Sequence, residues 1–255
     1  MGCRLKAIKL LYMLKYFFFP LLVFGGYRAS AQFNDSTNYH VIFNGTGSLN
    51  RARDGNAYLL NNGLRFELKK KSVALNATNN WVYGKSNGDF TNNDFSSTID
   101  FNLYKAIPHA YYWGLVNYNT SFSLKINKQL LAGGGIAYSI LDKPNTYLNI
   151  SNGLLYDLSD INTTDTTREN YHTYRNSFRL QMHFLIAGLI TIDSGNFLQN
   201  SLTRGNDYII RSTLGLGFKI NTWLTLNSSL SYNKISRTDS ENLLLTYGLK
   251  VERYF

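Results

Sequence analysis

Apolar and polar residues alternate along this chain from Tyr39 onward, in segments of about a dozen residues. The last segment, Leu243 to Phe255, shows the pattern clearly, with leucines and aromatic residues at odd positions and Thr246, Gly248, Lys250 and Glu252 at even ones. Successive side chains of a β-strand point to opposite faces, so a period of two predicts a strand with one apolar and one polar face. The chain is therefore predicted to be all-β.

About twelve segments share this pattern and are expected to be strands, an even number as bacterial membrane barrels require. They are residues 39–50, 58–68, 72–84, 95–106, 110–124, 129–141, 145–158, 175–184, 188–200, 208–219, 223–233 and 243–255. Most are longer than the five or six residues usual in soluble sheets and match a tilted membrane span.

A soluble β-sandwich and a membrane barrel differ in what their faces carry. The polar face of a sandwich meets water and favours Lys and Glu, whereas here the polar face is mostly Asn, Ser, Thr and Gly, which suits a crowded polar lumen. The apolar face is rich in Tyr, Phe and Leu, and we expect Trp113 and Trp223, near predicted turns, to belong to an outward aromatic girdle. These features favour a transmembrane antiparallel up-and-down β-barrel over a sandwich.

Barrels of this kind have short periplasmic turns and longer extracellular loops in alternation. Short turns are predicted at residues 69–71, 107–109, 142–144, 185–187 and 220–222. Longer loops are predicted at residues 85–94, 159–172, 201–207 and 236–240, with 125–128 a short exception. Pro108 and Pro144 fall in predicted turns, where a missing backbone donor disturbs no ladder.

The first 31 residues are interpreted as a secretory signal peptide, leaving residues 32–255 as a single barrel domain. A basic beginning is followed by the apolar stretch Tyr16 to Phe24 and by Ala29-Ser30-Ala31, a small-x-small cleavage site. The apolar stretch is shorter than the roughly 20 residues of a spanning helix, which argues against a membrane anchor. Cleavage is expected after Ala31.

Removal of this segment changes the charge and the cysteine content. It takes five basic residues and no acidic ones, so 21 basic and 16 acidic residues remain and the balance falls from +10 to +5. That balance is too mild to indicate nucleic-acid binding. Cys3 is the only cysteine, so the mature chain is expected to have no disulfide, zinc-thiolate site or cysteine nucleophile.

Several glycine and aromatic patterns resemble an uncharacterised family of bacterial outer-membrane β-barrels that includes salt-stress-induced members. They lie at residues 132–138, 148–156, 196–200, 206–209 and 246–251. The resemblance implies an outer-membrane barrel of a Gram-negative bacterium and brings no catalytic residues. The closing strand ending at Phe255 is also similar to those that the barrel assembly machinery recognises, although Arg253 stands where such signals usually carry an apolar residue.

Candidate chemistry is sparse. A membrane-embedded lipid-modifying enzyme needs a serine paired with a histidine, and none of His40, His109, His172 and His183 lies in a recognisable motif such as a Gly-x-Ser-x-Gly elbow. The acidic residues in or beside the predicted loop 159–172 suit calcium in type but fit no binding motif, so a solvated loop is expected; they are Asp157, Asp160, Asp165 and Glu169. Lys69 to Lys71 is interpreted as a solvated turn, and Gly133 to Gly135 as a strand that bends or gives room to a bulky neighbour.

The charged residues expected in the lumen suggest two functions. Ion pairs among them would plug the interior, and an unpaired set would line a narrow solute path. They are Arg65, Glu67, Asp100, Arg179, Arg211, Lys250 and Glu252. We therefore expect a non-enzymatic outer-membrane barrel, either an envelope structural component or a narrow small-solute channel, with no catalytic, cofactor or metal site. The expected partners are outer-membrane lipid and the assembly machinery, and the alternatives are a lipid-modifying enzyme and a scaffold or adhesin that binds a partner through its loops.

Overall fold

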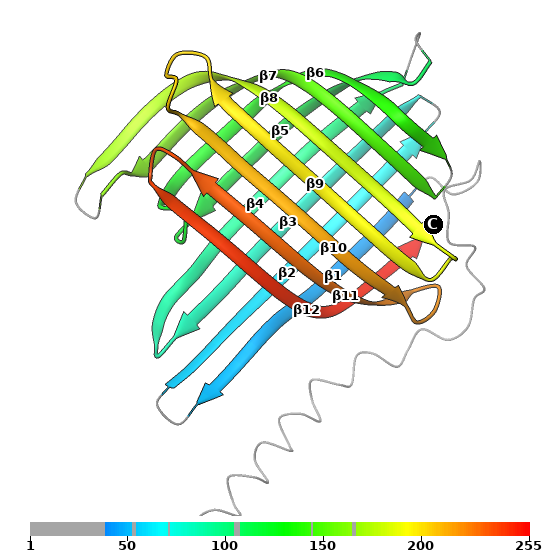
Figure 1. Cartoon of the computed structure of the whole chain (residues 1–255), viewed down its shortest axis with the longest axis horizontal. Helices are drawn as coiled ribbons and strands as arrows, with labels where there is room; N and C mark the ends of the chain where they lie inside the picture. Colours follow the sequence, from blue (N-terminus) through cyan, green and yellow to red (C-terminus); the bar gives the residue numbers. More distant parts are fainter. Residues whose placement is uncertain (1–38, 53–54, 71, 105–107, 144, 165–166) are drawn as a thin grey trace, which may run out of the picture. The chain divides into compact units, whose positions relative to one another are not determined.

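The structure, a computed structural model, describes residues 39–52, 55–70, 72–104, 108–143, 145–164 and 167–255. The predicted signal peptide lies outside the described residues. The described part of the chain forms twelve strands, each antiparallel to its sequence neighbours, and β12 pairs with β1 to close the barrel (Figure 1). The strands are β1 (Tyr39–Ala52), β2 (Gly55–Lys70), β3 (Val73–Ser86), β4 (Asp89–Leu103), β5 (Ala110–Ser121), β6 (Ile126–Lys143), β7 (Thr146–Asn162), β8 (Arg168–Ile186), β9 (Ile190–Ser201), β10 (Tyr208–Lys219), β11 (Leu224–Ile235) and β12 (Ser240–Tyr254).

The predicted transmembrane up-and-down barrel is thus confirmed. Each strand has between 12 and 19 residues, more than the roughly ten that a tilted strand needs to cross the hydrocarbon core. No helix among the described residues is long and apolar enough to cross a membrane.

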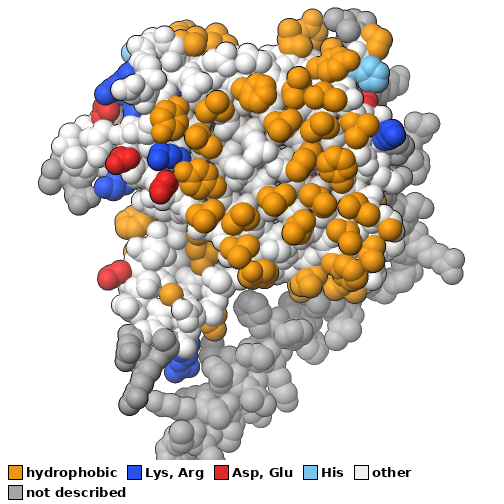
Figure 2. All heavy atoms as spheres, in the orientation of Figure 1, with side chains coloured by type: hydrophobic (Ala, Val, Ile, Leu, Met, Phe, Trp, Pro, Cys, Tyr) orange, Lys and Arg blue, Asp and Glu red, His pale blue; other side chains and the backbone are white. Residues whose placement is uncertain are grey.

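The period of two fixes which side chains face lipid. Outward positions carry large apolar residues with a third or more of their surface exposed, and Figure 2 shows them spread over much of the wall seen in that view. Inward positions carry small polar residues, many of them buried, such as Thr46, Asn117, Gln129 and Ser177. This distribution is inverted relative to a soluble protein and matches a barrel whose outer surface meets lipid.

Two predicted loops are wrong, because the strands continue through them. β3 and β4 are joined by only Asn87 and Gly88, which have φ angles of 52° and 96°, as a tight two-residue hairpin turn requires. The predicted loop at residues 159–172 is mostly β7 and β8, which end at Asn162 and begin at Arg168. Sequences rich in Asn, Thr and Asp look like loops, but here they form the ends of strands.

Two outward placements on and after β5 are also wrong. Trp113 is only 3% exposed and belongs to an interior cluster with Tyr111, Ala137 and Leu155. Gly153 makes room for it, since a Cβ there would lie 2.5 Å from Trp113 Cζ2. Leu124, at the end of the predicted strand 110–124 and of the parity of its outward residues, is also buried inside, whereas Trp223 is 44% exposed, as a girdle residue would be.

We call the end of the barrel where β1 begins and β12 ends the terminal end, and the opposite end the loop end. Tyr39 and Phe255 exchange two backbone hydrogen bonds at the terminal end, with N···O distances of 3.2 and 2.9 Å. The sequence prediction places the terminal end in the periplasm.

The β1–β12 pairing yields a first prediction. A Cβ at Gly248 would lie 2.6 Å from Thr46 Cα and closer still to the carbonyl oxygen of Gly45, so Gly248→Ala should push β12 away from β1. Gly45→Ala in the same strand pair is the matched control, because its Cβ would meet only the Phe43 ring at 3.5 Å. We expect boiled and unboiled samples of Gly248→Ala to lose their difference in electrophoretic migration, while Gly45→Ala keeps it. Equal behaviour of the two variants would contradict this account of closure.

Candidate functional site

The lumen contains three cavities that follow one another from the loop end to the terminal end. The rim cavity, about 760 Å³, lies at the loop end and includes Phe122, Lys125 and Thr164. The central cavity, about 400 Å³, shares Ser121, Ser123 and Asn242 with it, among other residues. The terminal cavity, about 740 Å³, is lined by residues near the other end such as Lys69, Tyr104 and Lys143.

Amides and hydroxyls dominate the central cavity. The inward alternation of six strands brings seven asparagines to its lining, Asn44, Asn61, Asn80, Asn119, Asn227, Asn233 and Asn242. Asp94 is its only acidic lining residue within the described chain, and it accepts hydrogen bonds from Ser121 Oγ at 2.7 Å and Ser123 Oγ at 2.7 Å. Most of the lining therefore offers neutral hydrogen-bonding groups to whatever enters.

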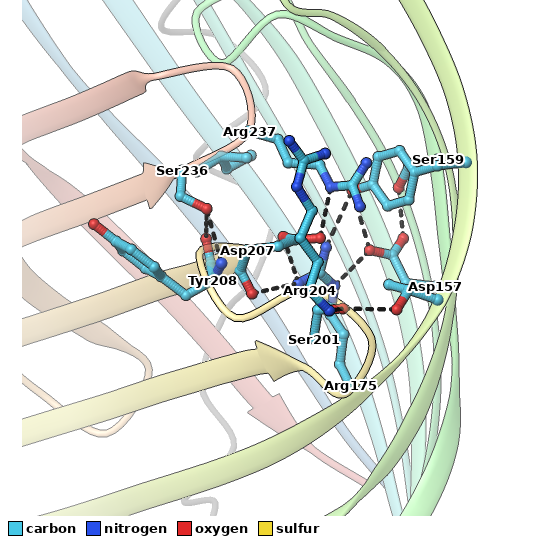
Figure 3. Close-up of polar contacts among 12 residues, drawn as sticks. Asp157, Ser159, Arg175, Ser201, Arg204, Asp207, Tyr208, Ser236 and Arg237 are labelled. Carbon is cyan, nitrogen blue, oxygen red and sulfur yellow. Dashed lines mark hydrogen bonds and ion pairs between the residues drawn. The ribbon is translucent and has the colours of Figure 1, made fainter.

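A buried ion network occupies the loop end beside β7 to β11 (Figure 3). Arg175 is fully buried, with Nε 2.6 Å from Asp157 Oδ2 and Nη1 2.8 Å from Asp207 Oδ1. Arg237 continues the network, with Nε 2.5 Å from Asp207 Oδ2 and Nη1 2.6 Å from Glu169 Oε1. These residues come from β7, β8 and the turns after β9 and β11, so the network joins elements far apart in the sequence.

Tyr171 completes the network on its inner side. Its ring centroid lies 3.7 Å from the Arg237 guanidinium carbon, and its hydroxyl donates to Asp157 Oδ2 at 3.3 Å. The same ring packs against a buried apolar cluster of Leu124, Ile126, Ile161, Ile209 and Ile235. Part of the bore at the loop end is therefore filled by protein. The central cavity lies mainly against β1–β5 and β10–β12.

The network corrects the prediction for the acidic residues of the predicted loop. Asp157 is completely buried in an ion pair rather than solvated. Asp160 pairs with Arg168, and Glu169 with Arg237. Asp165 lies outside the described residues. No group of three or more His, Cys, Asp or Glu side chains in the described ranges could hold a metal ion.

A second charged group lies at the terminal end beside the barrel closure. His40 Nδ1 is 2.8 Å from Glu67 Oε2 and its Nε2 is 3.5 Å from Glu252 Oε2, while Lys250 Nζ is 2.9 Å from the same Glu252 oxygen. This group joins β2, β1 and β12 across the lumen side of the closure. Of the two arrangements considered for the lumenal charges, ion pairing occurs at Arg65 with Glu67 and at Lys250 with Glu252.

The terminal cavity holds a different arrangement around Arg179. Its guanidinium carbon lies 4.7 Å from the centroid of the Trp113 ring and 5.1 Å from that of Phe197. Tyr104, in the turn after β4, lines the same cavity, and burial raises the pKa of its hydroxyl. Asp100 also lines it and accepts a hydrogen bond from Asn76 Nδ2 at 2.9 Å.

Arg65 lies between the central and terminal cavities and lines both. Half of its side-chain surface is exposed, and Nη1 is 3.3 Å from Glu67 Oε1. Arg65 therefore projects from β2 to where the two cavities adjoin.

The histidines contact carboxylates and aromatic rings. His183 Nδ1 is 2.6 Å from Asp193 Oδ1, and its ring stacks on Tyr147 at 5.5 Å. His109 and His172 lie beside the rings of Tyr138 and Tyr156 at 6.3 and 6.2 Å. With His40 between two glutamates, the contacts of these four histidines resemble structural polar contacts more than a serine–histidine pair.

Comparison with known proteins gives a family and a fold. Residues 53–249 match the model of a family described as "Protein of unknown function, DUF481". Among solved structures, the NanC porin superposes with a TM-score of 0.50 at 10% identity, covering 85% of this chain and 99% of that one. An outer membrane channel from Pseudomonas putida F1 gives 0.49 at 11% identity, with coverages of 91% and 100%. The translocator domain of the autotransporter NalP from Neisseria meningitidis gives 0.46 at 13% identity, with coverages of 96% and 95%. None of the curated proteins matches the chain in sequence.

The ion network generates a stability prediction. Arg175→Ala should lower the free energy of unfolding by about 3–5 kcal/mol, because it leaves Asp157 and Asp207 buried without their shared partner. Arg168→Ala removes an ion pair whose arginine side chain is 62% exposed and screened by solvent, so it should cost much less. Urea unfolding of both variants in the same lipid vesicles measures the difference. A loss for Arg175→Ala as small as that for Arg168→Ala would show that the network is not what stabilises the loop end.

Proposed function

The chain belongs to the DUF481 family of proteins of unknown function, and from that premise we propose that it is a narrow, non-enzymatic passage for small hydrophilic solutes through the outer membrane of a Gram-negative bacterium. One observation carries the proposal. Three cavities follow one another along the lumen, and neighbouring cavities share lining residues. Among the described residues, Arg65 alone lines both the central and the terminal cavity. A long side chain that is half exposed can change rotamer without disturbing the wall around it.

The fixed parts of the lumen explain why the passage is narrow. A barrel of twelve strands lies between filled eight-stranded barrels and open sixteen-stranded porins. The ion network and the apolar cluster around Tyr171 fill part of this bore at the loop end. What remains suits solutes of a few carbon atoms rather than large molecules.

An envelope structural role is the second candidate, and the pairing of Arg65 with Glu67 favours it. If this ion pair keeps Arg65 in place, the central and terminal cavities stay separate and the barrel is plugged. Conductance decides between the two roles. The contacts of the histidines give no support to a lipid-modifying enzyme. A scaffold role is the weaker alternative because three of the described connections at the loop end are short: residues 87–88, 122–125 and 236–239.

Export and assembly form part of the proposal. We infer that residues 1–31 direct export, and that the strand ending at Phe255 is recognised by the barrel assembly machinery. The amphipathic alternation of β12 supports the second inference, with Leu243, Leu245, Tyr247 and Leu249 facing outward.

The channel proposal predicts how Arg65 affects conductance. In planar bilayers, folded protein should show small discrete openings, and Arg65→Ala should enlarge them because it removes the side chain common to two cavities. Arg51→Ala is the matched control, since Arg51 is exposed and lies on the same outward face of β1 as Phe43 and Leu49. Its conductance should equal that of the unaltered protein. Folded protein that never conducts, with or without Arg65, would favour the plugged structural barrel.

The export proposal has its own test. Mass spectrometry of protein taken from the outer-membrane fraction should give a chain beginning at Gln32, since cleavage is expected after Ala31. Recovery from the inner membrane with residues 1–31 retained would contradict it and favour an anchor.

A further inference from the structure

Arg179 is a buried cation that forms no close ion pair with any described residue. It is 8% exposed, and its Nε has no hydrogen-bond acceptor. Its guanidinium lies over the rings of Trp113 and Phe197, and the Asp100 carboxylate attracts it only from beyond ion-pair distance. A charge taken out of water without a partner is costly, and two aromatic faces offset only part of that cost.

The nearby carboxylates already have other partners. Asp100 faces the same cavity but accepts from Asn76, and Glu67 is held by His40 and Arg65. The guanidinium of Arg179 thus lies at the wall of a cavity of about 740 Å³ with donors to offer. An anion that entered the cavity would meet a guanidinium that no described carboxylate contacts directly.

Arg211 repeats the arrangement on the other side of Phe197. Phe197 pairs with Arg179 across β8 and β9 and with Arg211 across β9 and β10, so the three residues form one row of the wall. Arg211 lines the central cavity, and its Nη2 donates to the neutral Gln129 Oε1 at 3.0 Å. The one carboxylate lining that cavity in the described ranges, Asp94, is held by hydroxyl donors.

We propose that Arg211 and Arg179 are two successive binding stations for small hydroxylated organic carboxylates in the lumen. A planar guanidinium matches a carboxylate with two parallel hydrogen bonds, and its weak hydration suits a buried site. The asparagines of the central cavity and Tyr147, Asn149 and Gln181 of the terminal cavity offer partners for hydroxyl groups. Movement between the stations rests on the proposed passage, whereas binding at either one does not.

Trp113 makes binding at Arg179 observable. The chain has three tryptophans, and Trp81 and Trp223 are exposed, so replacing those two with Phe leaves Trp113 as the reporter. Folded protein in detergent is titrated with sodium gluconate at constant ionic strength, with glucose as the neutral analogue. Gluconate should change Trp113 emission saturably and glucose should not.

Substitutions then assign the response. Arg179→Met should raise the apparent Kd for gluconate about 10- to 100-fold, as expected for loss of a charge-assisted hydrogen-bonded pair. Arg168→Met, which removes the same charge from the exposed ion pair with Asp160, should leave the Kd unchanged. If the Met variant does not fold, Arg179→Lys replaces it and should weaken gluconate about tenfold, because an ammonium lacks the planar fork.

Three results would overturn the assignment: an equal response to glucose, an unchanged Kd in the Arg179 variant, or tighter Arg179-dependent binding of inorganic phosphate than of gluconate. The last result would identify phosphate as the ligand class.

Bilayer recordings separate this inference from the proposed passage. Under a potassium chloride gradient, the reversal potential should indicate anion selectivity and should shift toward cation selectivity in Arg179→Met and in Arg211→Met. Cation selectivity of the unaltered protein would contradict a path built on these arginines. If gluconate binding depends on Arg179 in a folded barrel that does not conduct, the proposed passage is wrong and the binding station at Arg179 stands.

Discussion

Lipid hydrocarbon offers no hydrogen-bonding partners to the backbone, and this constraint determines how the sheet can cross the membrane. Every backbone N–H and C=O group at membrane depth needs a partner within the protein, so a sheet can cross lipid only if its first and last strands pair. Here β1 and β12 pair from His40 with Tyr254 to Gly47 with Tyr247, and the Tyr39–Phe255 hydrogen bonds extend the closure to the terminal end. Alternation then has one possible result: apolar side chains face lipid and polar ones face the lumen.

That arrangement makes a second demand, because the polar side chains of the inward face need hydrogen-bonding and ionic partners in a confined space. At the loop end the solution is a fixed one, in which Arg175 lies between Asp157 and Asp207, and Arg237 between Asp207 and Glu169. Buried pairs of this kind contribute little net stability compared with well-packed apolar residues, but breaking one is costly. The network therefore acts mainly to fix where β7, β8, β10 and the last turn meet.

The sequence was informative where one face meets lipid. The alternation of β12, the inward Arg65 and Glu67, and the short turn after β8 could be predicted because outward positions there must be apolar. It was misleading at the loop end, where polar residues occupy both faces of the strand and the alternation disappears, as at residues 91–94. On β5 the ambiguity has the opposite cause, because both faces carry aromatic residues. Tyr111 and Trp113 point inward and Tyr112 points outward, and alternation alone cannot say which face is which. The ion network was out of reach, because Glu169 and Arg237 are 68 residues apart and meet only once the register of the whole barrel is fixed.

The contrast between paired and unpaired arginines connects this architecture to function. Arg175 and Arg237 each contact two carboxylates and are held at the loop end, so they have little left to offer a solute. Arg179 and Arg211 form no close ion pair with a described carboxylate, and Phe197 lies between them in the wall. A barrel that serves only envelope structure gains nothing from buried guanidinium groups without a paired carboxylate, because each one lowers stability. A purely structural role does not explain why Arg179 and Arg211 lie in the two cavities beside neutral amides, whereas an anion path explains it directly.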